Sequence, residues 1–440
     1  RTKELVLPMA NKPFYVSYAL LLSRQFSVEA SLGSVLSSVD LPLHLMGTSQ
    51  VLVGNYKRTN DLHHEGHFFR VDLGGEIDYN AIRLGFWMAS DQGYKMALQE
   101  YSAKKAYLEA NPYELPDNLP DLLPTASVEK LVHEKPPYIS SISEVEDMAR
   151  ELSTVFKDYK EVIGSSVSLQ GNEMTFYKLT TEQVAIKQPL DFVELYIEGT
   201  VVTGDGKYIQ DSYILLAPSF NALPSLEHLK QIVSGFAQRL MNLKNAEVIS
   251  EDYTGPVLFE NEAVRQIFVD NLLGNDGGLC TYRIPLGVKE PSASFEDKIG
   301  KKLLDPRLSV INYSSMAEYM NIPLLGSYSI DAEGVIPEEE MLLVEKGVLK
   351  KVLNGRIPTD KVRYTTGSAR FIPFQGDVIY VTAPGTLHIK ADGGLKPEAM
   401  KKALLKAAKE AKSDYAYIVR RFAGNASLLY RVDVLERLLP

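Results

Sequence analysis

The chain has 440 residues, of which 45% are hydrophobic, and this length favours two or three domains with real cores. Its net charge of −9 comes from 47 basic and 56 acidic residues with no long basic block, which argues against a nucleic-acid groove. The single cysteine, Cys280, excludes an internal disulfide framework, and no apolar run reaches the roughly 18 residues that would predict a membrane-spanning segment.

The first predicted elements are strands over residues 13–57, where the stretches PFYVSYALL, FSVEASLGSVL and QVLVGNY alternate apolar and polar residues. The sequence begins with Arg1 rather than methionine, so we expect residues to precede it. If these include a removed export signal, the protein is periplasmic, and otherwise it belongs in the bacterial cytoplasm. The compartment therefore stays open.

Residues 62–67 read LHHEGH and hold three of the seven histidines. A zinc-peptidase helix of the HExxH type places two histidines one turn apart, with the glutamate directly after the first. Here His63 and His67 have that spacing, but the glutamate is Glu65 and Gly66 interrupts the turn. The flanking strand patterns predict a solvated, hairpin-like loop. The alternative is a weak metal site, because an extended segment would put His63, Glu65 and His67 on one side.

A long helical pattern covers residues 78–110 and ends at Asn111 and Pro112. Six prolines then occur within the 26 residues that begin at Pro112, too many for regular structure. We interpret residues 111–140 as a proline-rich connector inside the N-terminal domain. The next helix is predicted to reach about residue 160.

The start of that helix carries a capping signal, because SISE at 141–144 or SEVE at 143–146 offers a capping box. Strands with hairpin turns follow, and TGDGK at 203–207 lacks the spacing of a phosphate-binding loop. We interpret TGDGK as a hairpin turn. A leucine-rich helix is predicted over 225–244 and a lysine-rich helix, with a solvated face, over 396–412.

Other candidates for chemistry are weak. A GxSxG elbow is absent, and SVEK at 127–130 fits the SxxK pattern only as a short match of a kind that is common by chance. Cys280 has no histidine near it in the sequence, so we predict a packing role for its thiol. No histidine lies between His228 and His388, so residues 250–380 cannot provide a two-histidine zinc site.

Four ordered blocks carry a family resemblance. EDYTGPVLFENEAVRQIFVDNLL at 251–273 resembles the start of the C-terminal half of the TldD/PmbA family, once labelled modulators of DNA gyrase and associated with peptide processing. Residues 294–312 and 328–353 are similar to that family's next two segments, and TTGSARF at 365–371 with DVIYVTAPGTL at 377–387 is similar to its GSAR element and a later strand. The N-terminal stretches look like a larger, often exported branch of the family.

From these patterns we expect an α+β protein of two domains. Residues 1–248 are predicted to form an N-terminal α/β domain with antiparallel strands and long helices, and residues 249–440 a mostly antiparallel β domain. The last residues predict two strands and stop where relatives continue, so we expect the second domain to be truncated or gapped at its end.

The family resemblance also bears on whether the chain binds zinc. Family members that cleave peptides share an HExxxH helix, and aligning Glu262 with its glutamate puts Asn261 and Gln266 at the two histidine positions. Neutral amides are poor zinc ligands. The chain therefore resembles the histidine-less, PmbA-type side of the family, and we expect no cofactor. The resemblance implies a homodimer, or a heterodimer with an HExxxH-bearing partner.

Glu260 and Glu262 also have a simpler interpretation. Both are expected in the first turn of an amphipathic helix, where a carboxylate stabilises the positive helix end by roughly 0.3–1 kcal/mol. Three functions stay open at this point. The chain is a subunit that binds or presents polypeptide while a partner supplies zinc, or a structural or polypeptide-binding homologue outside any proteolytic complex, or an independent metalloenzyme using His63, Glu65 and His67.

Overall fold

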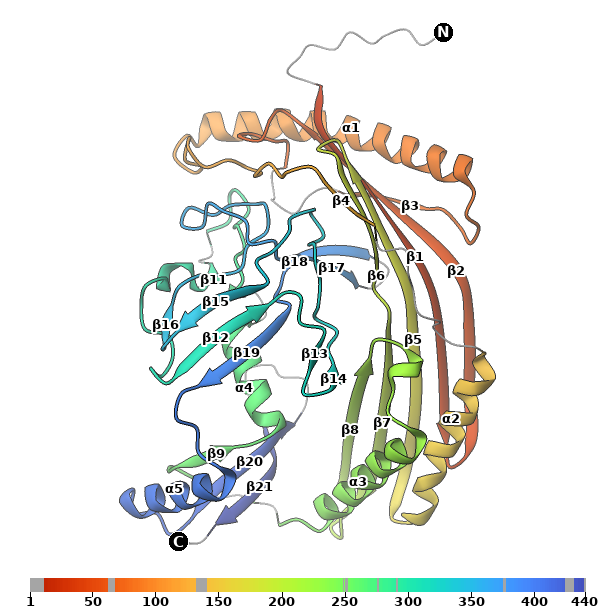
Figure 1. Cartoon of the computed structure of the whole chain (residues 1–440), viewed down its shortest axis with the longest axis vertical. Coiled ribbons are helices and arrows are strands. Elements are labelled where there is room, and N and C mark those ends of the chain that lie inside the picture. Colours follow the sequence, from red (N-terminus) through yellow and green to blue (C-terminus); the bar gives the residue numbers. More distant parts are fainter. Residues whose placement is uncertain are drawn as a thin grey trace.

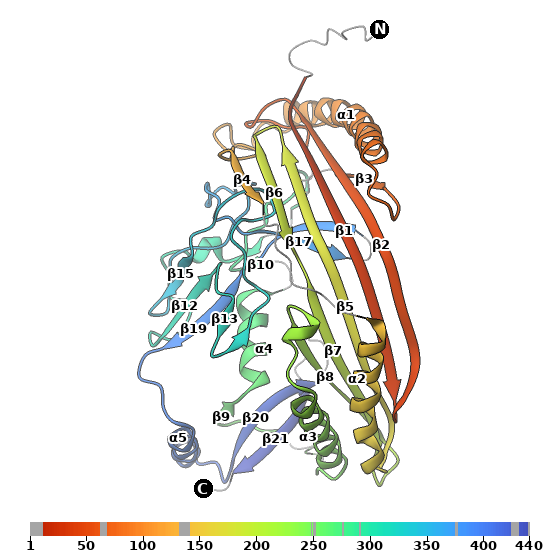
Figure 2. The same cartoon turned by 45° about the vertical axis from the view of Figure 1, so that its right-hand side comes forward.

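A large curved sheet dominates the computed structural model, and smaller sheets lie against one of its faces (Figure 1). Turning the molecule by 45° shows the same division, with the long strands of the large sheet running through most of its height (Figure 2). The described residues are 12–61, 68–131, 141–247, 249, 252–274, 277–289, 292–374, 377–423 and 431–438. No helix among them is long and apolar enough to cross a membrane.

The large sheet has eight strands within the described residues, in the order β3-β2-β1-β5-β6-β4, with β7 and β8 continuing from β5. The pairing is antiparallel except between β4 and β6. Their bounds are β1 (Pro13–Ser31), β2 (Ser34–Val53), β3 (Phe68–Asp72), β4 (Val128–Leu131), β5 (Val162–Thr180), β6 (Val184–Pro189), β7 (Phe192–Val202) and β8 (Tyr208–Ala217).

The predicted N-terminal strands are present, but as two long strands joined by a tight turn. Strands β1 and β2 run for 19 and 20 residues, and their pairing continues through irregularities at Ser23/Gln25 and Glu29/Ala30. Gly33 turns the chain between them with φ of +79°, a conformation that glycine adopts without strain. The expected hairpin at TGDGK is also present, because it joins β7 to β8.

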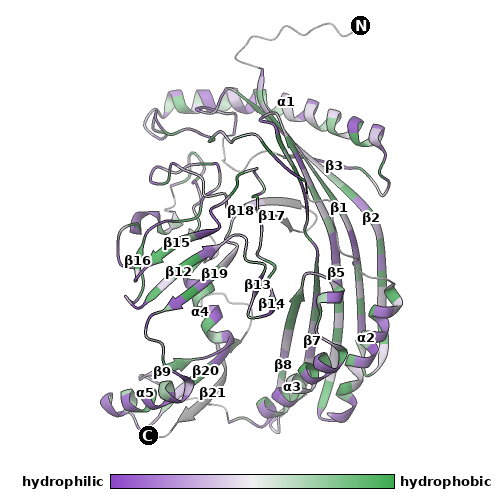
Figure 3. Cartoon of the chain, in the orientation of Figure 1, coloured by the Kyte–Doolittle hydropathy of each residue, from purple (hydrophilic) through white to green (hydrophobic). Residues whose placement is uncertain are grey.

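Successive side chains of a strand point to opposite faces, and this alternation gives the large sheet two different partners. On one face, Val28 and Leu169 belong to a core built with the helices that follow. On the other face, Ala19 and Phe176 pack with Ile330 of the C-terminal half. Figure 3 shows hydrophobic and hydrophilic positions alternating along these strands.

The three helices of this half are α1 (Tyr79–Ala110), α2 (Ile142–Thr154) and α3 (Leu226–Lys244). Short 3-10 helices η2 (Val155–Asp158) and η3 (Phe220–Ala222) lie beside them. The predicted bounds of α1 and α3 are confirmed within two residues. The predicted capping box of α2 is wrong, because Ser141 occupies the N-cap position without a side-chain cap hydrogen bond. Its hydroxyl instead lies 2.8 Å from the Ser143 hydroxyl.

The proline-rich connector packs against the body of the protein. Leu115, Leu119 and Leu122 are buried, although this stretch is irregular up to β4. Its backbone polar groups are partly satisfied by side chains, as where Arg58 donates to the Leu119 carbonyl at 2.7 Å. The connector thus forms part of a wall between the two halves rather than a free linker.

The C-terminal half consists of small, mostly antiparallel sheets, as predicted, and parallel pairing occurs between β10 and β11 and between β9 and β20. Its sheet of β16, β15, β12 and β19 carries a core of its own. The bounds are β9 (Val257–Phe259), α4 (Glu262–Leu272), β10 (Gly277–Gly278), β11 (Ala293–Ser294), η4 (Phe295–Lys298), β12 (Leu308–Tyr313), β13 (Glu318–Tyr319), β14 (Ile322–Pro323), β15 (Glu340–Glu345), β16 (Val348–Leu349), β17 (Ala369–Phe374), β18 (Asp377–Thr382), β19 (Thr386–Ala391), α5 (Pro397–Glu410), β20 (Ala416–Ala423) and β21 (Arg431–Leu438).

Candidate functional site

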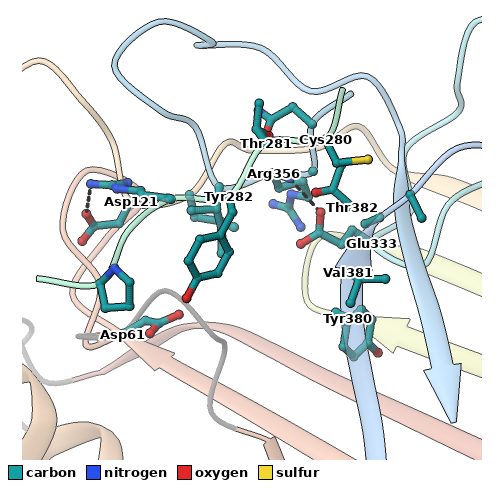
Figure 4. A pocket seen from close by; sticks show the side chains of 18 of the residues that line it. Asp61, Asp121, Cys280, Thr281, Tyr282, Glu333, Arg356, Tyr380, Val381 and Thr382 are labelled. Atoms are coloured by element: carbon teal, nitrogen blue, oxygen red, sulfur yellow. Dashed lines mark hydrogen bonds and ion pairs between the residues drawn. The ribbon is translucent and has the colours of Figure 1, made fainter. Parts of the chain in front are cut away.

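A cavity of about 1350 Å³ lies between the large sheet and the C-terminal half. Strands β1, β2, β3 and β5 supply one wall, the connector supplies Asp121 and Leu122, and residues between 273 and 384 supply the rest. In Figure 4, Glu333 and Tyr380 lie at one side of this space, and Asp61 and Asp121 lie at the other. Small-molecule sites typically occupy roughly 300–1,000 Å³, so this cavity has room for a longer ligand.

A buried ion pair joins the two halves at the cavity wall. The side chain of Arg356 is 1% exposed and that of Glu182 is 8% exposed, and Arg356 Nη2 lies 2.7 Å from Glu182 Oε1. Arg356 also donates through Nε to the Leu123 carbonyl at 2.7 Å. The same Glu182 oxygen accepts from the Tyr56 hydroxyl at 2.6 Å. One arginine of the C-terminal half therefore binds both the end of β5 and the connector.

Lys178 of β5 points from the sheet into this space. It is 2% exposed, its Nζ donates to the Ala332 carbonyl at 2.8 Å, and it lies 4.8 Å from the centre of the Tyr380 ring. Burial lowers the pKa of Lys178 to about 8, although the negative charge of Glu333 opposes this shift. The buried Lys178 side chain therefore gains or loses its proton at pH values near 8.

Asp331 faces the same region from the C-terminal half. Its carboxylate accepts backbone N–H bonds from Glu333 at 2.9 Å, from Val335 at 2.8 Å and from Ala369 at 3.1 Å. Burial, and after it the negative charge of Glu333, raise the pKa of Asp331 to about 7. This segment approaches the sheet closely at Gly334, which has φ of +89° and where a Cβ would lie 2.6 Å from a Val184 methyl.

The opposite end of the cavity has a second buried charge cluster, centred on Asp121 of the connector. Its Oδ2 accepts from Lys104 Nζ at 2.7 Å and from the Thr59 backbone N–H at 2.8 Å. Arg283 of the C-terminal half lies 3.4 Å from Asp121 Oδ1. Burial lowers the pKa of Lys104, and the charge of Asp121 opposes that shift. This cluster also ties the two halves together.

The three positions that match the family's zinc helix lie at the start of α4. Asn261 is the exposed N-cap residue, with φ of +52° and ψ of −124°, and the helix itself begins at Glu262. Gln266 is half-buried one turn further on. Glu260 precedes the helix, so the prediction that it lies in the first turn is wrong. The left-handed conformation of Asn261 separates it from the helical backbone.

Ion pairs rather than the helix end alone hold these two carboxylates. Arg421 Nε lies 3.1 Å from Glu262 Oε2, and Arg420 Nε lies 3.2 Å from Glu260 Oε2. Arg421 also donates to the Asp211 carboxylate, on β8 of the large sheet. The Arg421 guanidinium therefore neutralises the Glu262 carboxylate, so this carboxylate does not require a metal ion as its counter-charge.

The other predicted candidates do not join this site. His63, Glu65 and His67 lie outside the described residues. Within the described ranges, no group of three or more His, Cys, Asp or Glu side chains is arranged to hold a metal ion. SVEK belongs partly to the edge strand β4, so it does not have the helical geometry that an SxxK pair requires.

Cys280 lines the cavity, and burial raises the pKa of its thiol to about 12. This is the opposite of what activates a nucleophilic cysteine, and it agrees with the predicted packing role. The sequence prediction missed Lys178, Asp331 and Arg356. A signal for Lys178 was available, because strand alternation puts it on the same face as Phe176, and a lysine on a core face is unusual.

Residues 252–411 match the model of the PmbA/TldA metallopeptidase C-terminal domain. These residues form a domain of the TldD/PmbA family. No curated protein matches the chain. The family is metallopeptidase-like.

Solved structures of similar fold extend over nearly the whole chain. One is a protein described as a modulator of DNA gyrase from Thermotoga maritima, with a TM-score of 0.58 and 16% identity, covering 93% of this chain and 79% of that one. TldE from Thermococcus kodakarensis has a TM-score of 0.59 and 16% identity, covering 94% and 80%. A DNA gyrase modulator homologue from Bacteroides thetaiotaomicron has a TM-score of 0.54 and 12% identity, covering 95% and 80%. These similarities establish the fold.

Proposed function

We propose that the chain is a polypeptide-binding subunit of a TldD/PmbA-type peptide-processing assembly and that it has no zinc site of its own. The observation that carries this proposal is the ion-pair series Asp211, Arg421 and Glu262 at α4. A glutamate that activates water on zinc needs a free carboxylate beside a metal ligand. Here the guanidinium neutralises that carboxylate, and amide side chains stand at both histidine positions.

The cavity supports the polypeptide-binding part of the proposal. Its lining combines apolar and aromatic side chains with a few polar groups, which is the usual composition of a ligand site. The division into residues 1–248 and 249–440 is part of this proposal, because the cavity lies between these two predicted domains.

The zinc part is tested by metal analysis and by hydrolysis. We expect the purified chain to carry far less than one zinc per chain after dialysis, and to leave a flexible peptide uncleaved. One tightly held zinc per chain, or cleavage that a chelator stops, would overturn the proposal. Loss of that zinc in His63→Ala or His67→Ala would instead favour an independent metalloenzyme that uses His63, Glu65 and His67.

The assembly part is tested by sedimentation of the full chain, alone and mixed with an HExxxH-bearing relative from the same cell. We expect a homodimer or a heterodimer, because stable interfaces of this kind commonly bury about 2,000 Å² or more. A monomer in both experiments would remove the subunit proposal. It would leave the alternative of a polypeptide-binding homologue outside any proteolytic complex.

A further inference from the structure

The sheet side of the cavity carries a row of three paired side chains. The register pairs Thr48 of β2 with Ala19 of β1, and Ala19 with Lys178 of β5. Directly paired residues point to the same face, with strands about 4.8 Å apart, so Thr48 and Lys178 flank Ala19. All three are buried, with exposed fractions of 4%, 5% and 2%. Thr48 and Lys178 line the cavity, whereas Ala19 between them packs with Ile330.

Two hydroxyl groups that line this space have no hydrogen-bond partner within the described residues. They are Thr48 Oγ1 and the phenol of Tyr380. Buried polar groups are nearly always paired, so each unpaired one requires an explanation. Phe68 stacks on Tyr380 with ring centres 4.7 Å apart, which holds the phenol in place. Both hydroxyls are therefore donors available to a ligand in the cavity.

Lys178 has no carboxylate partner at ion-pair distance among the described residues, although charges surround it. Glu333 and Asp331 face it from the C-terminal half, and Arg356 and Glu182 face it at the wall. Arg356 is paired with Glu182, while Glu333 accepts from the Arg356 backbone N–H at 2.8 Å. Among the described residues Lys178 donates to the Ala332 carbonyl alone, which leaves two of its three hydrogens for another acceptor. A buried ammonium whose donor positions are not all filled is unfavourable.

We propose that Lys178, Thr48 and Tyr380 form an anchor for a carboxylate of the bound polypeptide, and specifically for its C-terminal carboxylate. This inference rests on the proposed polypeptide-binding function and names the group that the cavity holds. A carboxylate accepts several hydrogen bonds, and those donated by an ammonium are the strongest. The ammonium and the two hydroxyls supply the donors, and all three side chains line the cavity.

The test compares two peptides that differ only at one end. A short, N-terminally labelled peptide of alanine, glycine and serine is prepared with a free C-terminal carboxylate and with a C-terminal amide. Binding to the full chain is measured by fluorescence anisotropy. We expect the free acid to bind about tenfold or more tightly than the amide, the size expected for a hydrogen bond to a charged group. A third peptide, amidated and containing one glutamate, shows whether a side-chain carboxylate serves as well.

The variants assign this preference to the anchor. Lys178→Gln should reduce the affinity for the free acid to that for the amide. Lys130→Gln is the matched control, because Lys130 extends the same cross-strand row through Ile186 but is exposed on β4, outside the cavity lining. Tyr380→Phe should weaken binding of the free acid without lowering thermal stability, since its hydroxyl has no partner to lose.

The outcomes distinguish failure of the carboxylate anchor from failure of polypeptide binding. Equal affinity for acid and amide would overturn the anchor and leave polypeptide binding intact. Binding of neither peptide would overturn both. An acid preference that survives Lys178→Gln in a folded variant, checked by circular dichroism, would also overturn the assignment. If Lys178→Gln does not fold, an unchanged acid preference in Thr48→Val and Tyr380→Phe would do the same.

Discussion

The ion pair at the cavity wall joins the large sheet to the C-terminal half, whereas the Arg421–Glu262 pair lies within the C-terminal half, and the two pairs differ in how far they are buried. At the cavity wall, Arg356 and Glu182 are 1% and 8% exposed. At the start of α4, Arg421 and Glu262 are 18% and 42% exposed. Breaking a buried pair leaves an uncompensated charge in the interior, whereas a solvated pair contributes little. The cavity-wall pair is therefore expected to contribute much more to stability than the Arg421–Glu262 pair at the start of α4, where Arg421 also binds the buried Asp211 of the large sheet.

The largest expected effect comes from removing the buried arginine. Arg356→Met leaves Glu182 buried without its partner, and we expect the free energy of unfolding to fall by about 3–5 kcal/mol. Urea unfolding followed by circular dichroism measures this change. Arg363→Met is the matched control, because its side chain is 42% exposed and lies 3.9 Å from Asp360. Similar losses in the two variants would contradict the comparison.

An intermediate effect is expected on how the free energy of unfolding depends on pH, and Asp331 causes it. The folded state keeps this proton up to about pH 7, whereas the unfolded chain releases it near the ordinary value of 3.8. Between these values the folded state binds more protons, so rising pH lowers the free energy of unfolding. Asp331→Asn removes this contribution. We expect wild type to lose stability relative to the variant by up to about 1.4 kcal/mol for each pH unit in this range.

Urea unfolding of both proteins at a series of pH values between about 4 and 7 measures that difference. The comparison between wild type and variant cancels the titration of the other carboxylates. A difference that does not change with pH would show that Asp331 is ionised throughout, stabilised by its three backbone hydrogen bonds.

The smallest expected effect comes from the solvated pair. Glu262→Gln should lower the free energy of unfolding by about 1 kcal/mol or less, because the carboxylate is partly exposed and Arg421 keeps Asp211 as a partner. Unfolding under the same conditions as Arg356→Met gives the comparison directly. A loss as large as that of the buried pair would contradict the expectation that exposure decides how much each pair contributes.

The fold was predictable where local pattern decides it. Period-2 alternation predicts β1 and β2, and the capping and breaking residues around α1 predict its ends, because each depends on neighbours in the sequence. The start of α4 was not predictable from local pattern. Asn261 adopts its left-handed conformation where α4 packs against β20, which lies far along the chain. The match of Asn261, Glu262 and Gln266 to the family's zinc helix rests on the resemblance and stays a prediction. The anchor residues were not predictable, because Thr48, Lys178 and Tyr380 meet only through strand pairing between distant segments.

Strand β9 has a consequence for how the protein is made. It is the first strand of the C-terminal half, and its partner within the described residues is β20, with Val257 paired to Tyr417 and Phe259 to Val419. During synthesis β9 and the α4 that follows it leave the ribosome long before β20 does. Ala263 and Ile267 of α4 share a core with Val419 and Phe422, so they stay uncovered for that interval. This half therefore completes its folding only after β20 has been released, and ribosome-bound chains that end before Ala416 should expose α4 to protease.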